Sequence, residues 1–149
     1  MTIWFDMDGT IANLYAVEGW LDYLIAEDTH PYEAAKPMLN MSGLARQLNN
    51  LRRKGYRVGI ISWTSKNSTP EYEERVKTAK LEWLSTHLKS VQFDEIKIVP
   101  YGTNKWKVCK NGILFDDEEQ NRIRWKGMAF EPERITNILS NLNKWHPVK

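Results

Sequence analysis

Short apolar runs alternate along the chain with longer stretches in which apolar residues recur every three or four positions. The short runs are rich in β-branched or aromatic side chains, as buried strands are. They lie at residues 3–5, 58–61, 95–99, 113–115 and 128–130. The longer stretches have helical spacing and cover residues 17–27, 42–54, 70–88 and 132–145. Strands that alternate with helices predict one α/β domain, residues 1–149, with a mostly parallel sheet covered on both faces.

Start and stop signals mark the ends of several of these helices. Ser42 is the expected N-cap of the second helix, and Gly55 follows its basic last turn as a stop signal. Thr69 is the expected N-cap of the third helix, with Pro70 at the first helical position. The last helix carries one apolar stripe that runs to Trp145.

Composition places the chain among ordinary globular proteins. Its 149 residues are enough for one domain with a packed core, and 42% of them are hydrophobic. With 21 basic and 19 acidic residues, the net charge of +2 is too even to indicate a nucleic-acid or membrane-surface protein. The single cysteine, Cys109, excludes an intrachain disulfide and a cysteine-based metal site. Because the sequence shows neither a signal-peptide pattern nor an apolar run of ~18–20 residues, we expect a cytoplasmic protein.

Two carboxylates follow the first predicted strand. Asp6 stands at the strand end and Asp8 lies two residues later, so both can face one site in different roles. A carboxylate such as Asp6 can attack phosphorus and form an aspartyl phosphate, while Asp8 can protonate the leaving oxygen and then activate water. Gly9 permits the backbone angles that such a turn often requires. The alternative is an acidic surface turn without a catalytic role.

A second acidic pair, Asp116 and Asp117, follows the fourth predicted strand. In open parallel sheets ligands bind beyond the carboxyl ends of the strands, where this pair would meet Asp6. Adjacent acids repel one another unless a cation lies between them, and Mg²⁺ prefers a few carboxylate oxygens together with water. The alternative is an acid-rich helix N-terminus, and both can hold at once if Asp116 is the metal ligand.

A hydroxyl and a cation complete the candidate site. Ser62 ends the second predicted strand, at the height where a phosphoryl oxygen would lie. Lys105 follows the third strand and would offset the charge of a phosphoryl group beside several carboxylates. Nearby residues of the same type compete for both roles: Thr64 or Ser65 for the hydroxyl, and Lys107 or Lys110 for the cation.

These four pieces, in this order, resemble the motifs of the haloacid dehalogenase (HAD) superfamily. The segment Asp6–Thr10, which reads DMDGT, is similar to the first motif, and residues 60–62 are similar to the second. Lys105 is similar to the third motif and the acidic pair at 116–117 to the fourth. The resemblance covers most of the chain and implies a Rossmann-like three-layer sandwich with a small helical cap insertion.

Carried over to the matching positions, the resemblance implies a role for each candidate residue. Asp6 would be the nucleophile and Asp8 the general acid/base, while Ser62 would bind the phosphoryl group and Lys105 would balance charge. The implied metal-site residues are Asp6, Asp8 (through its backbone carbonyl) and Asp116, which would bind Mg²⁺ directly, and Asp117, which would lie behind these ligands. Around these residues we expect Gly9, Thr10, Trp63 and Thr64 to contact the substrate.

The reaction that the resemblance implies is Mg²⁺-dependent hydrolysis of a phosphomonoester through an aspartyl phosphate. Residues 5–9 and 63–65 also look similar to the 5'-nucleotidase (deoxyribonucleotidase) branch, which implies a nucleotide or another small phosphomonoester as substrate. The alternatives are a phosphatase of polynucleotide ends and a non-catalytic HAD-fold binding module. Nucleic acid is not favoured as a partner, because the basic residues beside Trp106 and Trp125 are more typical of a solvated face around a packed aromatic. The sequence leaves the oligomeric state open.

Residues 14–40 are the stretch available for a cap over the site, and they predict one helix with loops. Trp20, Tyr23 and Tyr32 would either stack on a base or pack the helix on the sheet. Four apolar residues form a stripe that favours packing: Trp20, Leu21, Leu24 and Ile25. A cap this small predicts an active site that is open, or closed by a partner subunit.

Overall fold

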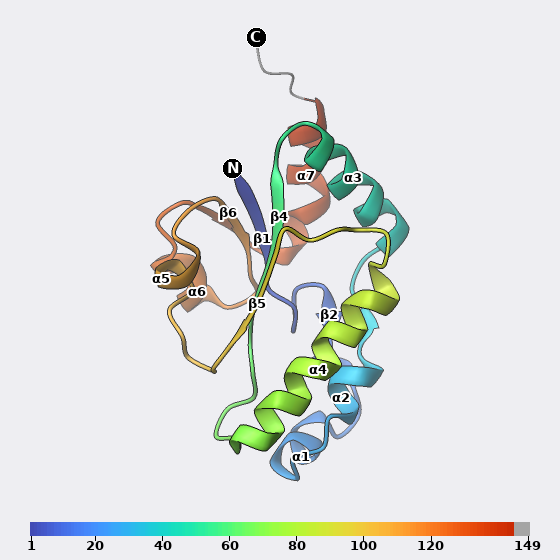
Figure 1. Ribbon diagram of the computed structural model, residues 1–149, viewed down its shortest axis with the longest axis vertical. Coiled ribbons are helices and arrows are strands. Elements are labelled where there is room, and N and C mark those ends of the chain that lie inside the picture. The colour runs from blue at the N-terminus through green and yellow to red at the C-terminus, as the bar shows by residue number, and fades with distance from the viewer. Residues whose placement is uncertain (145–149) are drawn as a thin grey trace.

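A parallel β-sheet lies at the centre of the molecule, whose computed structural model describes residues 1–144 (Figure 1). The sheet has five strands in the order β5-β4-β1-β6-β7, and all neighbouring strands run parallel. The strands are β1 (Thr2–Phe5), β4 (Arg57–Trp63), β5 (Glu95–Val99), β6 (Ile113–Phe115) and β7 (Met128–Phe130). Each strand lies where a short apolar run predicts it, so the expected α/β fold is confirmed.

Helices cover both faces of the sheet and give a Rossmann-like three-layer sandwich (Figure 1). One face carries α3 (Met41–Arg53), α4 (Pro70–His87) and α7 (Ile135–Lys144). The other face carries α5 (Lys105–Cys109) and α6 (Glu119–Arg124). No helix among residues 1–144 is long and apolar enough to cross a membrane.

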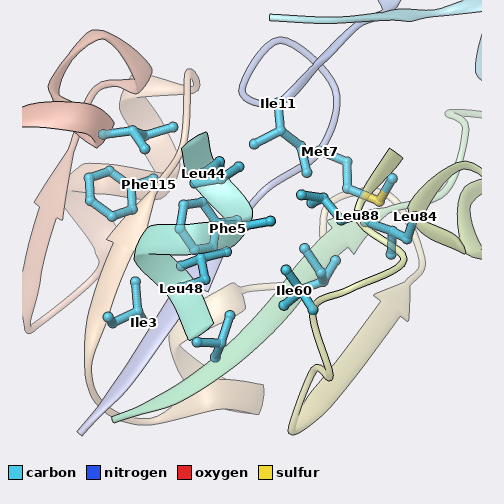
Figure 2. Close-up of a cluster of buried hydrophobic side chains, with 14 of the residues drawn as sticks. Ile3, Phe5, Met7, Ile11, Leu44, Leu48, Ile60, Leu84, Leu88 and Phe115 are labelled. Carbon is cyan, nitrogen blue, oxygen red and sulfur yellow. The ribbon is translucent and has the colours of Figure 1, made fainter. Parts of the chain in front are cut away.

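Alternate side chains of β1 divide between the two helical layers, because successive strand residues point to opposite faces. Ile3 and Phe5 belong to the cluster under α3 and α4, where Figure 2 shows them beside Leu48. Trp4 belongs to the opposite cluster, together with Trp125 after α6. Burial on both faces explains why this strand is a continuous apolar run rather than an alternating one.

Gly59 in β4 packs against the indole ring of Trp4 in β1. A Cβ atom at this position would lie 2.5 Å from Cζ3 of Trp4, and Trp4 is only 1% exposed. We therefore expect Gly59→Ala to lower the free energy of unfolding by about 1–3 kcal/mol, the usual cost of overpacking a core. Urea unfolding measures this change. An unchanged midpoint would show that the ring of Trp4 moves aside freely.

Helix starts follow the sequence signals at one helix and depart from them at another. α4 begins after Thr69, whose Oγ1 accepts a hydrogen bond from the backbone N–H of Tyr72 at 3.2 Å, as predicted. The N-cap of α3 is Asn40, and the prediction of Ser42 is wrong. Oδ1 of Asn40 accepts a hydrogen bond from the backbone N–H of Gly43 at 2.9 Å. An asparagine two residues earlier is an equally good cap, so Ser42 lies inside the first turn.

The last helix is preceded by a short 3₁₀ turn. This turn, η2 (Pro132–Arg134), leads into α7 close to the predicted start. Ile135 and Leu139 of α7 are buried in the same cluster as Leu48 of α3. Trp145, the predicted end of the apolar stripe, lies outside the described residues.

The segment between β1 and α3 forms a small helical insertion. Its elements are β2 (Ala12–Asn13), η1 (Leu14–Ala16), α1 (Trp20–Ile25), α2 (His30–Ala34) and β3 (Lys36–Pro37). β2 and β3 pair antiparallel at the base of the insertion. The predicted helix over 17–27 is shorter than expected. A second helix, α2, stands where the sequence predicts a loop, because Pro31 occupies one of its first positions and starts a helix.

Candidate functional site

Asp6 and Asp116 follow the adjacent parallel strands β1 and β6, so their carboxylates meet at one edge of the sheet. Lys105, the first residue of α5, reaches both of them. Its Nζ lies 3.0 Å from Oδ1 of Asp6 and 2.6 Å from Oδ2 of Asp116. All three residues are at most 7% exposed. Lys105 therefore supplies the cation of this cluster, whereas the competing Lys107 and Lys110 are exposed.

Three carboxylates stand close enough together to share one cation. Oxygen atoms of Asp6, Asp116 and Asp117 lie within 4.8 Å of one another. Burial and the charge of Asp6 raise the pKa of Asp116 and of Asp117 above the usual carboxyl range, a crowding that a divalent cation would relieve. This oxygen donor set fits Mg²⁺. The side chain of Asp8 is not part of the set, and the HAD resemblance assigns only its backbone carbonyl to the metal.

The loop after β6 and the helix α6 hold Asp116 in place through both carboxylate oxygens. The backbone N–H of Glu118 donates to Oδ1 at 2.9 Å, and Nδ2 of Asn121 donates to Oδ2 at 3.1 Å. Arg122 donates to the backbone carbonyl of Asp116 at 2.9 Å. α6 begins at Glu119, so an acid-rich helix start and a fixed candidate metal ligand occur together.

A cavity of about 510 Å³ opens beside this acidic cluster. Among the charged residues that line it are Asp6, Asp8, Asp117 and Lys105. Aromatic side chains from the cap and from the sheet edge line much of the remainder: Tyr15, Trp20, Tyr32, Trp63 and Tyr101. The volume is within the ~300–1,000 Å³ that small-molecule sites usually have. Acidic and basic groups beside an aromatic wall suit a phosphate ester that carries a ring system.

Gly9 and Thr10 shape the loop after β1, and neither is among the described residues that line the cavity. Gly9 has a φ of +77°, and a Cβ atom there would lie 2.2 Å from Oδ2 of Asp117. The hydroxyl of Thr10 accepts a hydrogen bond from the backbone N–H of Asp117 and lies within 3.2 Å of Oδ2 of Asp6. The structure thus does not support the predicted substrate contact of Gly9 and Thr10. They fix the spacing of two candidate metal ligands instead.

The serine and threonine hydroxyls on the cavity wall belong to Thr64 and Ser65, whereas Ser62, the predicted phosphoryl-binding residue, is not among the described residues that line it. β4 continues one residue beyond its predicted end, to Trp63, which leaves Ser62 fully buried. Its Oγ accepts a hydrogen bond from Nζ of Lys80 at 2.7 Å. Trp63 and Thr64, the other two predicted substrate-binding residues, both line the cavity.

Asp8 lines the cavity and pairs with a lysine that sequence analysis missed. Its Oδ2 accepts a hydrogen bond from Nζ of Lys80 at 2.8 Å. Burial raises the pKa of Asp8 above the usual carboxyl value, although the ammonium of Lys80 opposes the shift. The sequence does hold a signal for this lysine. Tyr72, Val76 and Leu84 lie on the buried side of α4, where positions four residues apart face the same way. Lys80 occupies the position between Val76 and Leu84 in this series, so a charged residue stands where an apolar one is expected.

α1 does not pack on the sheet, and the prediction from its apolar stripe is wrong. Leu21 is 53% exposed and Ile25 is 72% exposed. The helix is only six residues long and belongs to the insertion, so its apolar side lines the cavity. Trp20 meets Tyr15 edge to face, with ring centroids 4.9 Å apart. The arrangement fits the alternative interpretation, in which aromatic residues of the cap, Tyr32 among them, present a surface to a ligand.

The tryptophans beside the basic residues pack against each other. The rings of Trp106 and Trp125 meet edge to face with centroids 5.1 Å apart, and Trp125 is only 4% exposed. This is the packed-aromatic arrangement that the sequence favours, and it leaves the ring of Trp125 no face for stacking on a nucleobase.

Comparison with known proteins adds no assignment to this site. No protein-family model matches the chain, and no curated protein matches it. Its function is therefore inferred from the geometry of the site.

Proposed function

We propose that the chain is a Mg²⁺-dependent phosphomonoester hydrolase of the HAD type, with Asp6 as nucleophile. The observation that carries the proposal is the meeting of Asp6, Asp8, Asp116 and Lys105 at one edge of the sheet, beside a cavity. Burying charged groups is costly even when they are paired, so a purely structural role gives no reason to gather so many. Metal binding and phosphoryl transfer do explain why three carboxylates, including that of Asp117, lie within 4.8 Å of one another.

In the first step, a carboxylate oxygen of Asp6 attacks the phosphorus atom of the bound ester. A bond forms between this oxygen and phosphorus, and the bond from phosphorus to the ester oxygen breaks. The departing oxygen takes a proton from the carboxyl group of Asp8 and leaves as an alcohol. The raised pKa of Asp8 favours the protonated form that this step needs.

In the second step, Asp8 accepts a proton from a water molecule as the water oxygen attacks the phosphorus of the aspartyl phosphate. The bond from phosphorus to the Asp6 oxygen breaks, inorganic phosphate leaves, and both acids return to their starting state. Each of the two acids has a lysine partner of its own. Asp6 lies 3.0 Å from Lys105, whereas Asp8 lies 2.8 Å from Lys80.

The remaining groups hold and neutralise the phosphoryl group. Lys105 keeps the Asp6 carboxylate in place and offsets the negative charge of the transferring group. Thr64 and Ser65 supply hydroxyl donors on the cavity wall. Asp6, Asp116 and Asp117 would hold Mg²⁺, which when bound offsets charge on the phosphoryl oxygens.

The cavity wall supports a nucleotide or another small phosphomonoester as the substrate. Trp20, Trp63 and Tyr101 present rings to the same cavity as Asp6. Stacking of a base on an aromatic side chain contributes about 1–3 kcal/mol. A cavity of about 510 Å³ that the chain's own cap lines on one side suits a monomeric ligand better than the end of a polynucleotide.

p-Nitrophenyl phosphate, together with a panel of nucleotides, sugar phosphates and end-phosphorylated oligonucleotides, tests the proposal. We expect release of inorganic phosphate, with mononucleotides preferred within the panel. We also expect the rate to fall at least about 100-fold when EDTA removes the metal, since the metal offsets several kcal/mol of charge in the transition state. Turnover of no compound, with or without Mg²⁺, would contradict the enzyme assignment and favour a binding module. Turnover of oligonucleotides alone would favour the end phosphatase.

A further inference from the structure

Lys80 lies in the middle of α4, and its side chain is only 1% exposed. Its neighbours along the helix, Val76 and Ala79, belong to a buried apolar cluster, and its Nζ lies 5.3 Å from the ring centre of Tyr32. An ammonium group in such surroundings is costly unless every proton has an acceptor. The hydrogen-bond acceptors around the ammonium of Lys80 therefore indicate the role of this buried charge.

All three protons of the Lys80 ammonium have an acceptor. Nζ lies 2.8 Å from Oδ2 of Asp8, 2.7 Å from Oγ of Ser62 and 2.8 Å from the backbone oxygen of Trp63. Two of these acceptors belong to the end of β4, and the third belongs to the loop after β1. Lys80 thus links the carboxylate of Asp8 to the end of β4 in the central sheet.

Lys80 is not among the described residues that line the cavity, so a ligand bound there would contact Asp8 rather than the ammonium behind it. A purely structural role for it is a weak explanation, because an apolar side chain of similar length fills such a space at no cost in desolvation. The ion pair does place a constraint on Asp8, the residue that must meet the leaving oxygen. Only one oxygen of that carboxylate, Oδ2, is bonded to Lys80, and the side chain is 17% exposed.

We propose that Lys80 is a positioning residue for proton transfer by Asp8, an inference that rests on the proposed phosphatase function. By holding Oδ2, the ammonium of Lys80 turns Oδ1 of Asp8 toward the leaving oxygen. Proton transfer depends on close contact between the two oxygens, so a carboxyl group that is free to rotate transfers its proton less often. Lys80 thus acts through Asp8 and touches no reacting atom.

The sharpest test compares two esters of similar shape that differ in how much they need a proton. p-Nitrophenolate is a stable leaving group, whereas phenolate is more basic and leaves readily only when it is protonated. For Lys80→Met we expect kcat/KM to fall about 100-fold with phenyl phosphate and less than about 10-fold with p-nitrophenyl phosphate. The value of kcat/KM includes only the steps through departure of the leaving group, so it isolates the first proton transfer. A merely structural role would lower both values equally.

Lys77→Met is the matched control, because Lys77 lies on the same helix and its side chain is 42% exposed. We expect it to leave both rates unchanged. If wild-type protein and Lys77→Met hydrolyse both esters and Lys80→Met loses both rates by the same factor, the positioning role is overturned. If wild-type protein hydrolyses neither ester, the proposed function itself fails and the role of Lys80 fails with it.

Removing Lys80 alone leaves the carboxylate of Asp8 without its partner, and this variant is the one most at risk of unfolding. The variant that combines Asp8→Asn with Lys80→Met removes both charges, and it is compared with Asp8→Asn alone. If Lys80 acts through Asp8, both variants have the same ratio of kcat/KM between the two esters. A further change of that ratio in the double variant would overturn the proposal.

Discussion

Asp6→Asn is expected to lower kcat for p-nitrophenyl phosphate by at least about 10³-fold, because an amide is not a nucleophile toward phosphorus. Asparagine has nearly the shape of aspartate, and its side-chain oxygen can still accept the hydrogen bond from Lys105, whose Nζ lies 3.0 Å from Oδ1 of the carboxylate. The amide NH₂ then takes the place of Oδ2 beside the hydroxyl of Thr10, which can accept a hydrogen bond from it. We therefore expect a folded protein. Initial rates with Mg²⁺ and a circular-dichroism spectrum check both parts of the prediction.

Asp22→Asn is the matched control for this substitution. Asp22 is an exposed acid on α1, and it is not one of the described residues that line the cavity. The same chemical change at this position is expected to leave the rate unaltered. A rate for Asp6→Asn within about tenfold of the wild-type rate would contradict a covalent mechanism at Asp6, since loss of a nucleophile costs far more.

Lys105→Met is expected to affect both stability and activity, because this ammonium is buried between two carboxylates. Its loss leaves Asp6 and Asp116 close together without a cation. Breaking a buried ion pair on one side costs about 3–5 kcal/mol, so we expect the free energy of unfolding in EDTA to fall by this amount. We expect kcat/KM in Mg²⁺ to fall at least about 100-fold, the usual effect of removing a group that offsets transition-state charge.

Mg²⁺ is expected to restore part of the lost stability, because an ion that binds only the folded state stabilises it. The rise in unfolding temperature on adding Mg²⁺ should then be larger for Lys105→Met than for wild-type protein. Lys107→Met, an exposed lysine on the same helix, serves as the control and should behave as wild type. Equal stability of Lys105→Met and Lys107→Met in EDTA would contradict the assignment of Lys105 as the cation of the cluster.

The sequence alone predicts the sheet and the residues at its edge well. A run such as residues 113–115 is apolar because both faces of its strand are covered, and the polar residue that follows must then stand at the strand end. Parallel order places the ends of β1 and β6 side by side, which brings Asp6 and Asp116 together. The same reasoning places the cation in the segment after β5, but the choice of Lys105 over Lys107 and Lys110 comes only from its burial in the structure.

Other parts of the site depend on contacts between segments far apart in the chain. Lys80 is 72 residues from Asp8, and a single lysine in a helix does not reveal its partner. The sequence predicts that the second strand ends at Ser62. Pairing with β5 extends β4 to Trp63, so Ser62 is buried within the strand. The stripe on α1 has the spacing of a core helix, but the insertion directs it to the cavity, where Ile25 is 72% exposed.

The central claim is that phosphate is transferred to Asp6, and trapping the phosphoryl enzyme tests it most directly. Asp8→Asn removes the base of the second step but not the nucleophile of the first, and p-nitrophenolate leaves without a proton. With p-nitrophenyl phosphate and Mg²⁺, this variant should release about one nitrophenolate per chain in a burst, the kinetic sign of a covalent intermediate. Peptide mass spectrometry after an acid quench should then place one phosphoryl group on Asp6. Phosphate on another residue, or turnover with none bound to the chain, would contradict the account.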